Sequence, residues 1–95
     1  MGLRVTDEKM INIVEDVMTK FNKEIVNALE KKSCKAKSIT IKNNNIIYVE
    51  QENEELGYVG KPKRIDSKLL KEIIKEDFVP VIVPMGLDEK GISYN

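Results

Sequence analysis

One short apolar run near the end of the chain constrains the fold more than any other feature. Residues Val79–Val83 read Val-Pro-Val-Ile-Val, and Pro84 follows directly. A continuous apolar run of this length is typical of a strand that is buried on both faces of a parallel sheet. Proline cannot donate to a ladder, so Pro80 is expected at the start of this strand and Pro84 at its end. Because parallel sheets carry helices on their faces, the run predicts an α/β fold.

The first third of the chain predicts one long amphipathic helix. Thr6 is the expected N-cap, and the helix should end at about Lys31 or Lys32. Its length leaves room for a bend or a break near Thr19. Apolar side chains recur at spacings of three and four, and they would face the core: Met10, Val14, Val17, Phe21, Ile25 and Ala28.

A second, shorter helix is expected in the last third of the chain. Asp66 or Ser67 would cap it, and it should end near Glu76. Its buried side would carry four apolar residues: Leu69, Leu70, Ile73 and Ile74. The chain stops directly after a strand, where a further helix would cover the sheet, and this predicts an incomplete unit.

The middle of the chain predicts a β-hairpin and a short third strand. Ala36–Ile41 and Ile46–Glu50 read as the two strands, and Asn43–Asn45 as their turn, because asparagine tolerates a positive φ. Leu56–Gly60 reads as a short strand whose two glycines indicate a close backbone approach or a bulge. Asp88–Gly91 reads as a turn.

Composition excludes several classes of function. The 95 residues carry 16 basic and 16 acidic side chains, so the net charge supports neither nucleic acid nor an anionic membrane as a partner. No apolar run reaches the roughly 18–20 residues that span a bilayer. The chain has no histidine and one cysteine, Cys34, which argues against an internal disulfide and the usual zinc sites and predicts a cytoplasmic protein.

Four sequence blocks resemble one known family in their order and separations. They are Gly2–Asp7 (Gly-Leu-Arg-Val-Thr-Asp), Asn22–Val26 (Asn-Lys-Glu-Ile-Val), Leu56–Gly60 (Leu-Gly-Tyr-Val-Gly) and Phe78–Asn95. Together they resemble the middle of the acetylglutamate kinases, which have the amino-acid-kinase fold. The chain departs from the family pattern at Thr40–Asn45, where Thr-Ile-Lys-Asn-Asn-Asn replaces Ser-Gly-Lys-Asp-Gly-Asn and both glycines are lost.

The resemblance implies a fold and a reaction. Residues 1–95 would form one incomplete piece of an αβα sandwich, with a mainly parallel sheet and a β-hairpin, corresponding to the central, acetylglutamate-binding part of the enzyme. Family members transfer the γ-phosphoryl group of ATP to the side-chain carboxylate of N-acetyl-L-glutamate in arginine biosynthesis. Catalysis of such a transfer rests on positioning and on groups that stabilise charge on the phosphoryl group.

ATP and Mg²⁺ are the cofactors that the resemblance implies, yet this chain carries none of the family's groups for them. The family's glycine-rich phosphate loops and its two catalytic lysines lie outside the matching segment. The five glycines of the chain form no phosphate-binding motif. No catalytic, cofactor-binding or metal-binding residue is therefore assigned, and we expect this chain alone to be inactive.

Two residues match family positions in the N-acetyl-L-glutamate site. Arg4 corresponds to an arginine that binds a substrate carboxylate, for which a guanidinium offers two parallel N–H donors. Asn95 corresponds to the first asparagine of a Tyr-Asn-x-Asn-Ala-Asp segment, and its amide supplies both a donor and an acceptor. Without the resemblance, Arg4 would be read as a surface arginine and Asn95 as a frayed terminal residue.

Three functions are open at this point. The first is a segment of an acetylglutamate kinase, from a split, truncated or decaying gene or as an excised piece. Its partners would be N-acetyl-L-glutamate and either a second copy, as a homo-oligomer, or a complementary kinase segment. The second is a non-catalytic module that binds N-acetylglutamate or pairs with a kinase subunit. The third is an unrelated small α/β binding domain.

Overall fold

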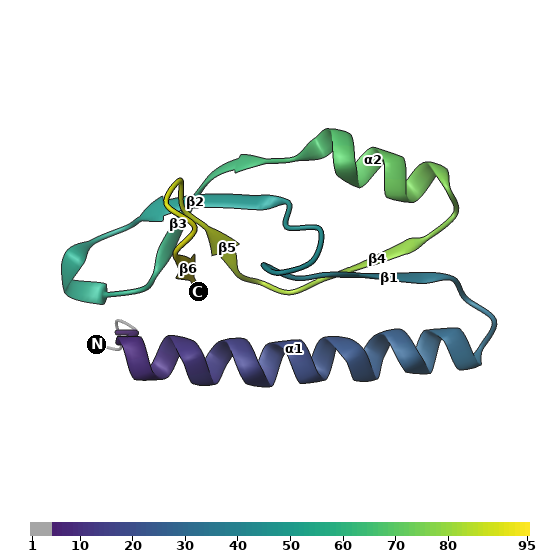
Figure 1. The fold of residues 1–95 in the computed structure, drawn as a ribbon, viewed down its shortest axis with the longest axis horizontal. Helices are drawn as coiled ribbons and strands as arrows, with labels where there is room; N and C mark the ends of the chain where they lie inside the picture. The colour runs from purple at the N-terminus through teal and green to yellow at the C-terminus, as the bar shows by residue number, and fades with distance from the viewer. Residues whose placement is uncertain (1–4) are drawn as a thin grey trace.

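The computed structural model of the chain describes residues 5–95, which form two helices, six strands and one 3₁₀ turn. In chain order the elements are α1 (Glu8–Lys31), β1 (Ala36–Ile39), β2 (Ile47–Gln51), the 3₁₀ turn (Glu54–Leu56), β3 (Gly60–Ile65), α2 (Ser67–Lys75), β4 (Val79–Ile82), β5 (Gly86–Leu87) and β6 (Ser93–Tyr94). Figure 1 shows α1 along one side and α2 on the opposite side, with β1 and β4 between them.

The strands form two sheets. β1 and β4 make a two-stranded parallel sheet, in register from Ala36 opposite Val79 to Ile39 opposite Ile82. The second sheet has the order β3-β2-β5-β6, in which β2 is antiparallel to β3 and parallel to β5. Helices on both sides of a parallel pair, with a mixed sheet at one end, confirm the α/β class (Figure 1).

Helix α1 begins one residue later than predicted and runs without a break. The carboxylate of Asp7, and not the hydroxyl of Thr6, caps the helix by accepting from the Met10 N–H group at 2.7 Å. Thr6 instead forms a backbone bridge with Gly57, and its buried hydroxyl has no hydrogen-bond partner among the described residues. The helix continues through Thr19, where its length left room for a bend.

The predicted apolar stripe of α1 does not all face the core. The residues buried on this helix are Ile11 and Asn22, and half-buried side chains beside them include Val14, Met18 and Ile25. Four large apolar side chains on the outer side are 46–57% exposed: Met10, Ile13, Val17 and Phe21. Ala28 is also exposed. The helix therefore carries one apolar face toward the sheet and a second toward solvent.

Strand β4 occupies most of the apolar run Val79–Val83, but it is not buried on both faces. Val79 and Ile82 are 43% and 40% exposed. The physical reason is that, among residues 5–95, β4 has a single strand neighbour, β1. Expecting a strand in the middle of a parallel sheet was therefore wrong for the part of the chain that the structure describes.

Pro80 within β4 and Pro84 just beyond it break no hydrogen bond between β4 and β1. The Val79 N–H group donates to the Lys35 carbonyl at 2.8 Å, and the Val83 N–H group donates to the Ile39 carbonyl at 3.0 Å. Alternate N–H groups therefore face β1, and Pro80 falls on the opposite edge. Pro84, predicted at the end of the strand, lies two residues beyond its last residue, Ile82.

The predicted hairpin between residues 36–41 and 46–50 is wrong, because its strands join different sheets. β1 pairs with β4, whereas β2 pairs with β3 across a bulge and with β5. The turn itself exists: the Thr40 N–H group donates to the Asn43 carbonyl at 2.9 Å, and Asn44 has a φ of 62°. The two strands diverge after this turn.

The segment Leu56–Gly60 is not a strand along its length. Leu56 ends the 3₁₀ turn, and Gly57 has a φ of 69°, which breaks the extended conformation. Strand β3 begins only at Gly60 and runs through a basic stretch that the sequence analysis left unassigned. Its charged and proline residues are exposed, as is common on edge strands.

Helix α2 begins and ends as predicted, with Asp66 as its N-cap and Glu76 as its C-cap. The core has two parts, one on each side of the parallel pair. Ile11, Val83 and Met85 form the part beneath α1, and Ile39, Ile46 and Ile73 form the part beneath α2. Ile74, predicted to be buried, is 53% exposed.

Neither helix of residues 5–95 combines the length and apolar character that crossing a bilayer requires.

Candidate functional site

Thr6, two residues before α1, is bonded to the loop that precedes β3. The Thr6 N–H group donates to the Leu56 carbonyl at 2.8 Å, and the Tyr58 N–H group donates to the Thr6 carbonyl at 2.7 Å. These two bonds form a parallel bridge between Thr6 and Gly57. Thr6 is fully buried there, at 0% exposure. The position of the chain just before α1 is therefore fixed by residues about fifty positions later.

The last residue of the chain is bonded to the same loop. The Asn95 N–H group donates to the Tyr58 carbonyl, and the Gly60 N–H group donates to the Asn95 carbonyl, both at 2.9 Å. Tyr58 thus bonds Thr6 through its N–H group and Asn95 through its carbonyl. Segments from opposite ends of the sequence meet on the backbone of one residue.

Of the two predicted site residues, the structure describes one. Asn95 is half-buried and directly follows β6. Arg4 lies outside the described residues and stands two positions before Thr6 in the sequence. The structure therefore brings Asn95 together with Thr6, and the role of each predicted site residue stays a prediction.

Tyr94 is the buried aromatic group next to Asn95. Its ring centroid lies 5.7 Å from that of Tyr58, and its residue is 7% exposed. Burial raises the pKa of the Tyr94 phenol, and the negative charge of Asp88 raises it further. The phenol is therefore neutral at pH 7, and it adds no negative charge beside Asn95 that would oppose an anionic ligand.

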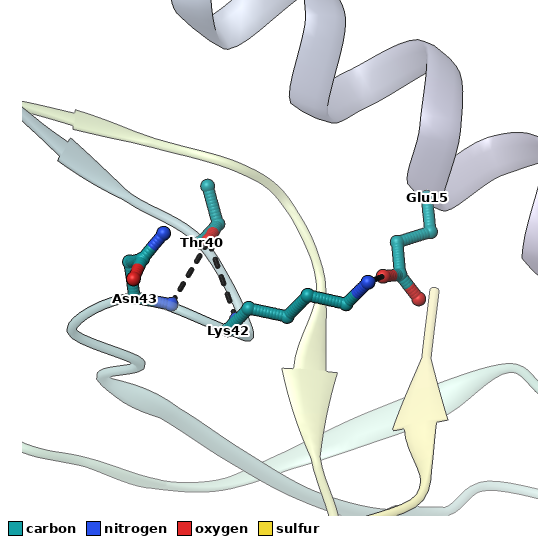
Figure 2. A network of polar contacts seen from close by, with 4 residues as sticks. All are labelled: Glu15, Thr40, Lys42 and Asn43. Carbon is teal, nitrogen blue, oxygen red and sulfur yellow. Dashed lines mark hydrogen bonds and ion pairs between the residues drawn. The ribbon is translucent and has the colours of Figure 1, made fainter.

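A separate polar cluster lies where the chain leaves β1 (Figure 2). The Thr40 hydroxyl accepts from the N–H groups of Lys42 and Asn43, at 3.2 and 3.1 Å. The Lys42 Nζ atom lies 3.1 Å from a carboxylate oxygen of Glu15 on α1. Because the Lys42 side chain is 78% exposed, this ion pair is worth little energetically. None of these four residues was a predicted site residue.

The comparison with known proteins decides the family. A model of the Amino acid kinase family matches residues 2–95. The chain belongs to the amino acid kinase family. This confirms the resemblance stated from the four sequence blocks, all of which lie within the match.

Within the amino acid kinase family, the similar curated proteins include acetylglutamate kinases. The Pelagibacter ubique enzyme is 60% identical over 94 residues, and the Kosmotoga olearia enzyme is 41% identical over 97 residues. Each alignment covers 99% of this chain but only 33% and 34% of the two relatives. The chain therefore spans about a third of the length of the relatives it matches.

A solved structure supports the fold. The crystal structure of smu.665 from Streptococcus mutans matches with a TM-score of 0.90, over 99% of this chain and 39% of that one. At 19% sequence identity, this likeness bears on the fold alone. It places the arrangement of helices and strands described above within a larger chain.

The described residues do not fit ATP or Mg²⁺, which the family implies. A Cβ atom added at Gly57, Gly60 or Gly86 would lie within 3 Å of atoms of the protein itself. These glycines therefore serve internal packing and do not line a phosphate cradle. Within residues 5–95, no three His, Cys, Asp or Glu side chains are grouped to hold a metal ion. We assign no residue of this range to either group.

Sequence reasoning missed Tyr58 as a member of the site. The signal was present, because Leu56–Gly60 is one of the four family blocks and carries two glycines close together. Because the block was interpreted as a strand, its bonds to two distant segments were not predicted: Tyr58 bonds both Thr6 and Asn95. Neither a periodicity nor a spacing rule reports such a contact.

Proposed function

We propose that this chain provides the N-acetyl-L-glutamate-binding part of an acetylglutamate kinase. That enzyme transfers the γ-phosphoryl group of ATP to the side-chain carboxylate of its substrate and forms an acyl phosphate. The observation that carries the proposal is the meeting of Thr6 and Asn95 on Tyr58. Similarity to acetylglutamate kinases over 99% of the chain supports it.

Arg4 and Asn95 would orient the substrate. The Arg4 guanidinium would bind one carboxylate through two N–H groups, and the Asn95 amide would hydrogen-bond a second polar group of the substrate. A glutamate-type carboxyl, with a pKa of about 4.3, is already ionised at neutral pH, so no residue here needs to remove a proton. Fixing the nucleophile in place is a large part of what catalysis of this transfer requires.

The groups that would bind ATP and Mg²⁺ are expected outside residues 1–95. When bound, Mg²⁺ would neutralise charge on the phosphates during transfer. We therefore propose that this chain has no kinase activity alone and acts as part of a larger enzyme in the cytoplasm.

The test of this proposal is binding. Addition of N-acetyl-L-glutamate to the isotopically labelled chain should shift the NMR signals of the Tyr58, Gly60 and Asn95 amides, whereas L-glutamate, which lacks the acetyl group, should shift them less. Arg4→Ala should weaken binding about ten- to a hundredfold, since a hydrogen bond to a charged group is lost. Arg4→Lys should retain the charge without the two-pronged geometry and should fall between. Unchanged affinity in Arg4→Ala would contradict the assignment.

A subunit-pairing role is the second candidate, and one observation favours it. The outer face of α1 presents Met10, Ile13, Val17 and Phe21 to solvent along one stripe. Charged residues of both signs flank this stripe, among them Asp16 and Lys20. Such a surface is self-complementary, because two antiparallel copies would pair apolar groups with each other and opposite charges at the rims. We therefore propose a second copy of the chain as the occupant.

A further inference from the structure

The short segment Gly57–Gly60, here called the strap, forms backbone hydrogen bonds with two segments that are far apart in the sequence. Its backbone bonds Thr6 on one side and Asn95 on the other through Tyr58, and Gly60 adds a second bond to Asn95. The Gln51 side-chain amide donates to the Gly57 carbonyl at 2.8 Å. The strap is thus bonded to β2 as well as to Thr6 and Asn95.

Gly57 is the residue on which the Thr6 side of the strap depends. Its φ of 69° lies in the region that favours glycine. A Cβ atom at this position would lie 2.2 Å from the Thr6 carbonyl oxygen and 3.0 Å from the Thr6 carbonyl carbon. These are backbone atoms, so a side chain at residue 57 forces Thr6 and the strap apart.

The Asn95 side of the strap is equally tight. A Cβ atom at Gly60 would lie 2.9 Å from the Tyr94 Cβ atom and 3.0 Å from a Val49 methyl group. Val59, between the two halves, is 6% exposed, and its carbonyl accepts from the Glu52 N–H group at 3.0 Å. The strap therefore cannot slide relative to β2 without breaking several bonds at once.

We infer that the strap fixes Thr6 relative to Asn95, and that Gly57 is a positioning residue for N-acetyl-L-glutamate. This inference rests on the proposed function. Gly57 touches no substrate in this account. It acts through Thr6, which follows Arg4 by two positions in the sequence, because backbone bonds join Thr6, Tyr58 and Asn95 into one unit. Small displacements of such a unit weaken binding strongly.

The test uses a hybrid enzyme, in which this chain replaces the homologous segment of the Pelagibacter ubique acetylglutamate kinase. Gly57→Ala should raise the KM for N-acetyl-L-glutamate about ten- to a hundredfold. The KM for ATP should stay within about twofold, because these residues do not contact the nucleotide. A purely structural defect would instead lower the active fraction and hence kcat, while the KM of the remaining active enzyme stays the same.

Gly91→Ala is the matched control. Gly91 also has a positive φ, of 81°, but a Cβ atom there would meet nothing within 4 Å. This variant carries the backbone strain without the clash at Thr6, so its KM values should match those of the unmodified hybrid. An equal rise in KM in Gly91→Ala and Gly57→Ala would overturn the inference, since strain alone would then explain both.

Gln51→Ala is a milder variant that keeps the test decisive if Gly57→Ala fails to fold. Gln51 is exposed, and its loss removes one neutral hydrogen bond to the strap. The expected rise in KM for N-acetyl-L-glutamate is about two- to tenfold. An unchanged KM in both Gly57→Ala and Gln51→Ala, alongside a raised KM in Arg4→Ala, would overturn the strap and leave the proposed function standing. An unchanged KM in Arg4→Ala would instead contradict the proposed function.

Discussion

At the residue scale, Asn22 links α1 to both strands of the parallel pair. It is 3% exposed, in the middle of a helix face that is otherwise apolar. Its Nδ2 group donates to the Val81 carbonyl of β4 at 2.8 Å, and its Oδ1 atom accepts from the Ser38 hydroxyl of β1. A buried amide is tolerated here because both of its ends are bonded. The Asn22–Val26 block of the sequence thus has a structural role at its first residue.

The first prediction is that Asn22→Ala lowers the free energy of unfolding by about 1–3 kcal/mol, because the Ser38 hydroxyl and Val81 carbonyl lose a buried partner. Asn27→Ala, on the exposed side of the same helix, should change it by no more than about 0.5 kcal/mol. Urea denaturation followed by circular dichroism measures both. Equal midpoints for the two variants would show that the Asn22 bonds contribute nothing.

At the element scale, the turn between β1 and β2 explains how the chain tolerates the loss of two family glycines. The second of them corresponds to Asn44, which has a φ of 62°. The first corresponds to Ile41, which does not have a positive φ. Asparagine adopts the left-handed region more readily than most residues, so the turn keeps its shape without glycine.

The second prediction concerns this turn. Asn44→Gly should leave the free energy of unfolding unchanged or raise it slightly, whereas Asn44→Ala should lower it by about 1 kcal/mol, because alanine is strained at a positive φ. Asn43→Gly, next to it without a positive φ, should be mildly destabilising. Thermal unfolding of the three variants gives the order. If Asn44→Ala were as stable as Asn44→Gly, the conformation of residue 44 would not matter to the fold.

The elements that local pattern determines were predictable, and those set by distant contacts were not. Both helices and β4 follow from apolar spacing and capping residues, and their observed bounds agree within one or two residues. The hairpin failed because pairing of β1 with β4 joins residues some forty positions apart, which no local rule reports. Strand β3 was missed because an exposed, basic edge strand has no apolar alternation.

The candidate site shows the same division. Arg4 and Asn95 came from a family resemblance and not from the physics of the local sequence. The joining of Thr6 and Asn95 through Tyr58 is a tertiary contact between residues far apart in the sequence, and it depends on a glycine whose positive φ was unforeseen. The sequence could therefore name candidate residues, but not the strap that joins Thr6 to Asn95.

At the scale of the whole molecule, the outer face of α1 and the free edge of β4 leave apolar groups in solvent. Along α1 these are Met10, Ile13, Val17 and Phe21, and on β4 they are Val79 and Ile82. Exposed apolar patches and unpaired strand edges promote association. We therefore expect the 95-residue chain to self-associate.

The third prediction tests this association. Val17→Glu combined with Phe21→Glu should convert the chain from a dimer or larger species to a monomer, because each charge would be placed in an apolar contact. Asn27→Glu, an exposed change on the same helix, should leave the assembly intact. Sedimentation velocity distinguishes the species. A monomeric unmodified chain would contradict a pairing role for this face.

We propose that residues 1–95 form the substrate-binding third of an acetylglutamate kinase. The most direct test of this claim is the acyl phosphate made by the hybrid enzyme and trapped with hydroxylamine. The hybrid should form acyl hydroxamate only when both ATP and N-acetyl-L-glutamate are present, and the isolated chain should stay at background. A folded hybrid that forms none, while the unmodified Pelagibacter ubique enzyme forms it readily, would contradict the claim.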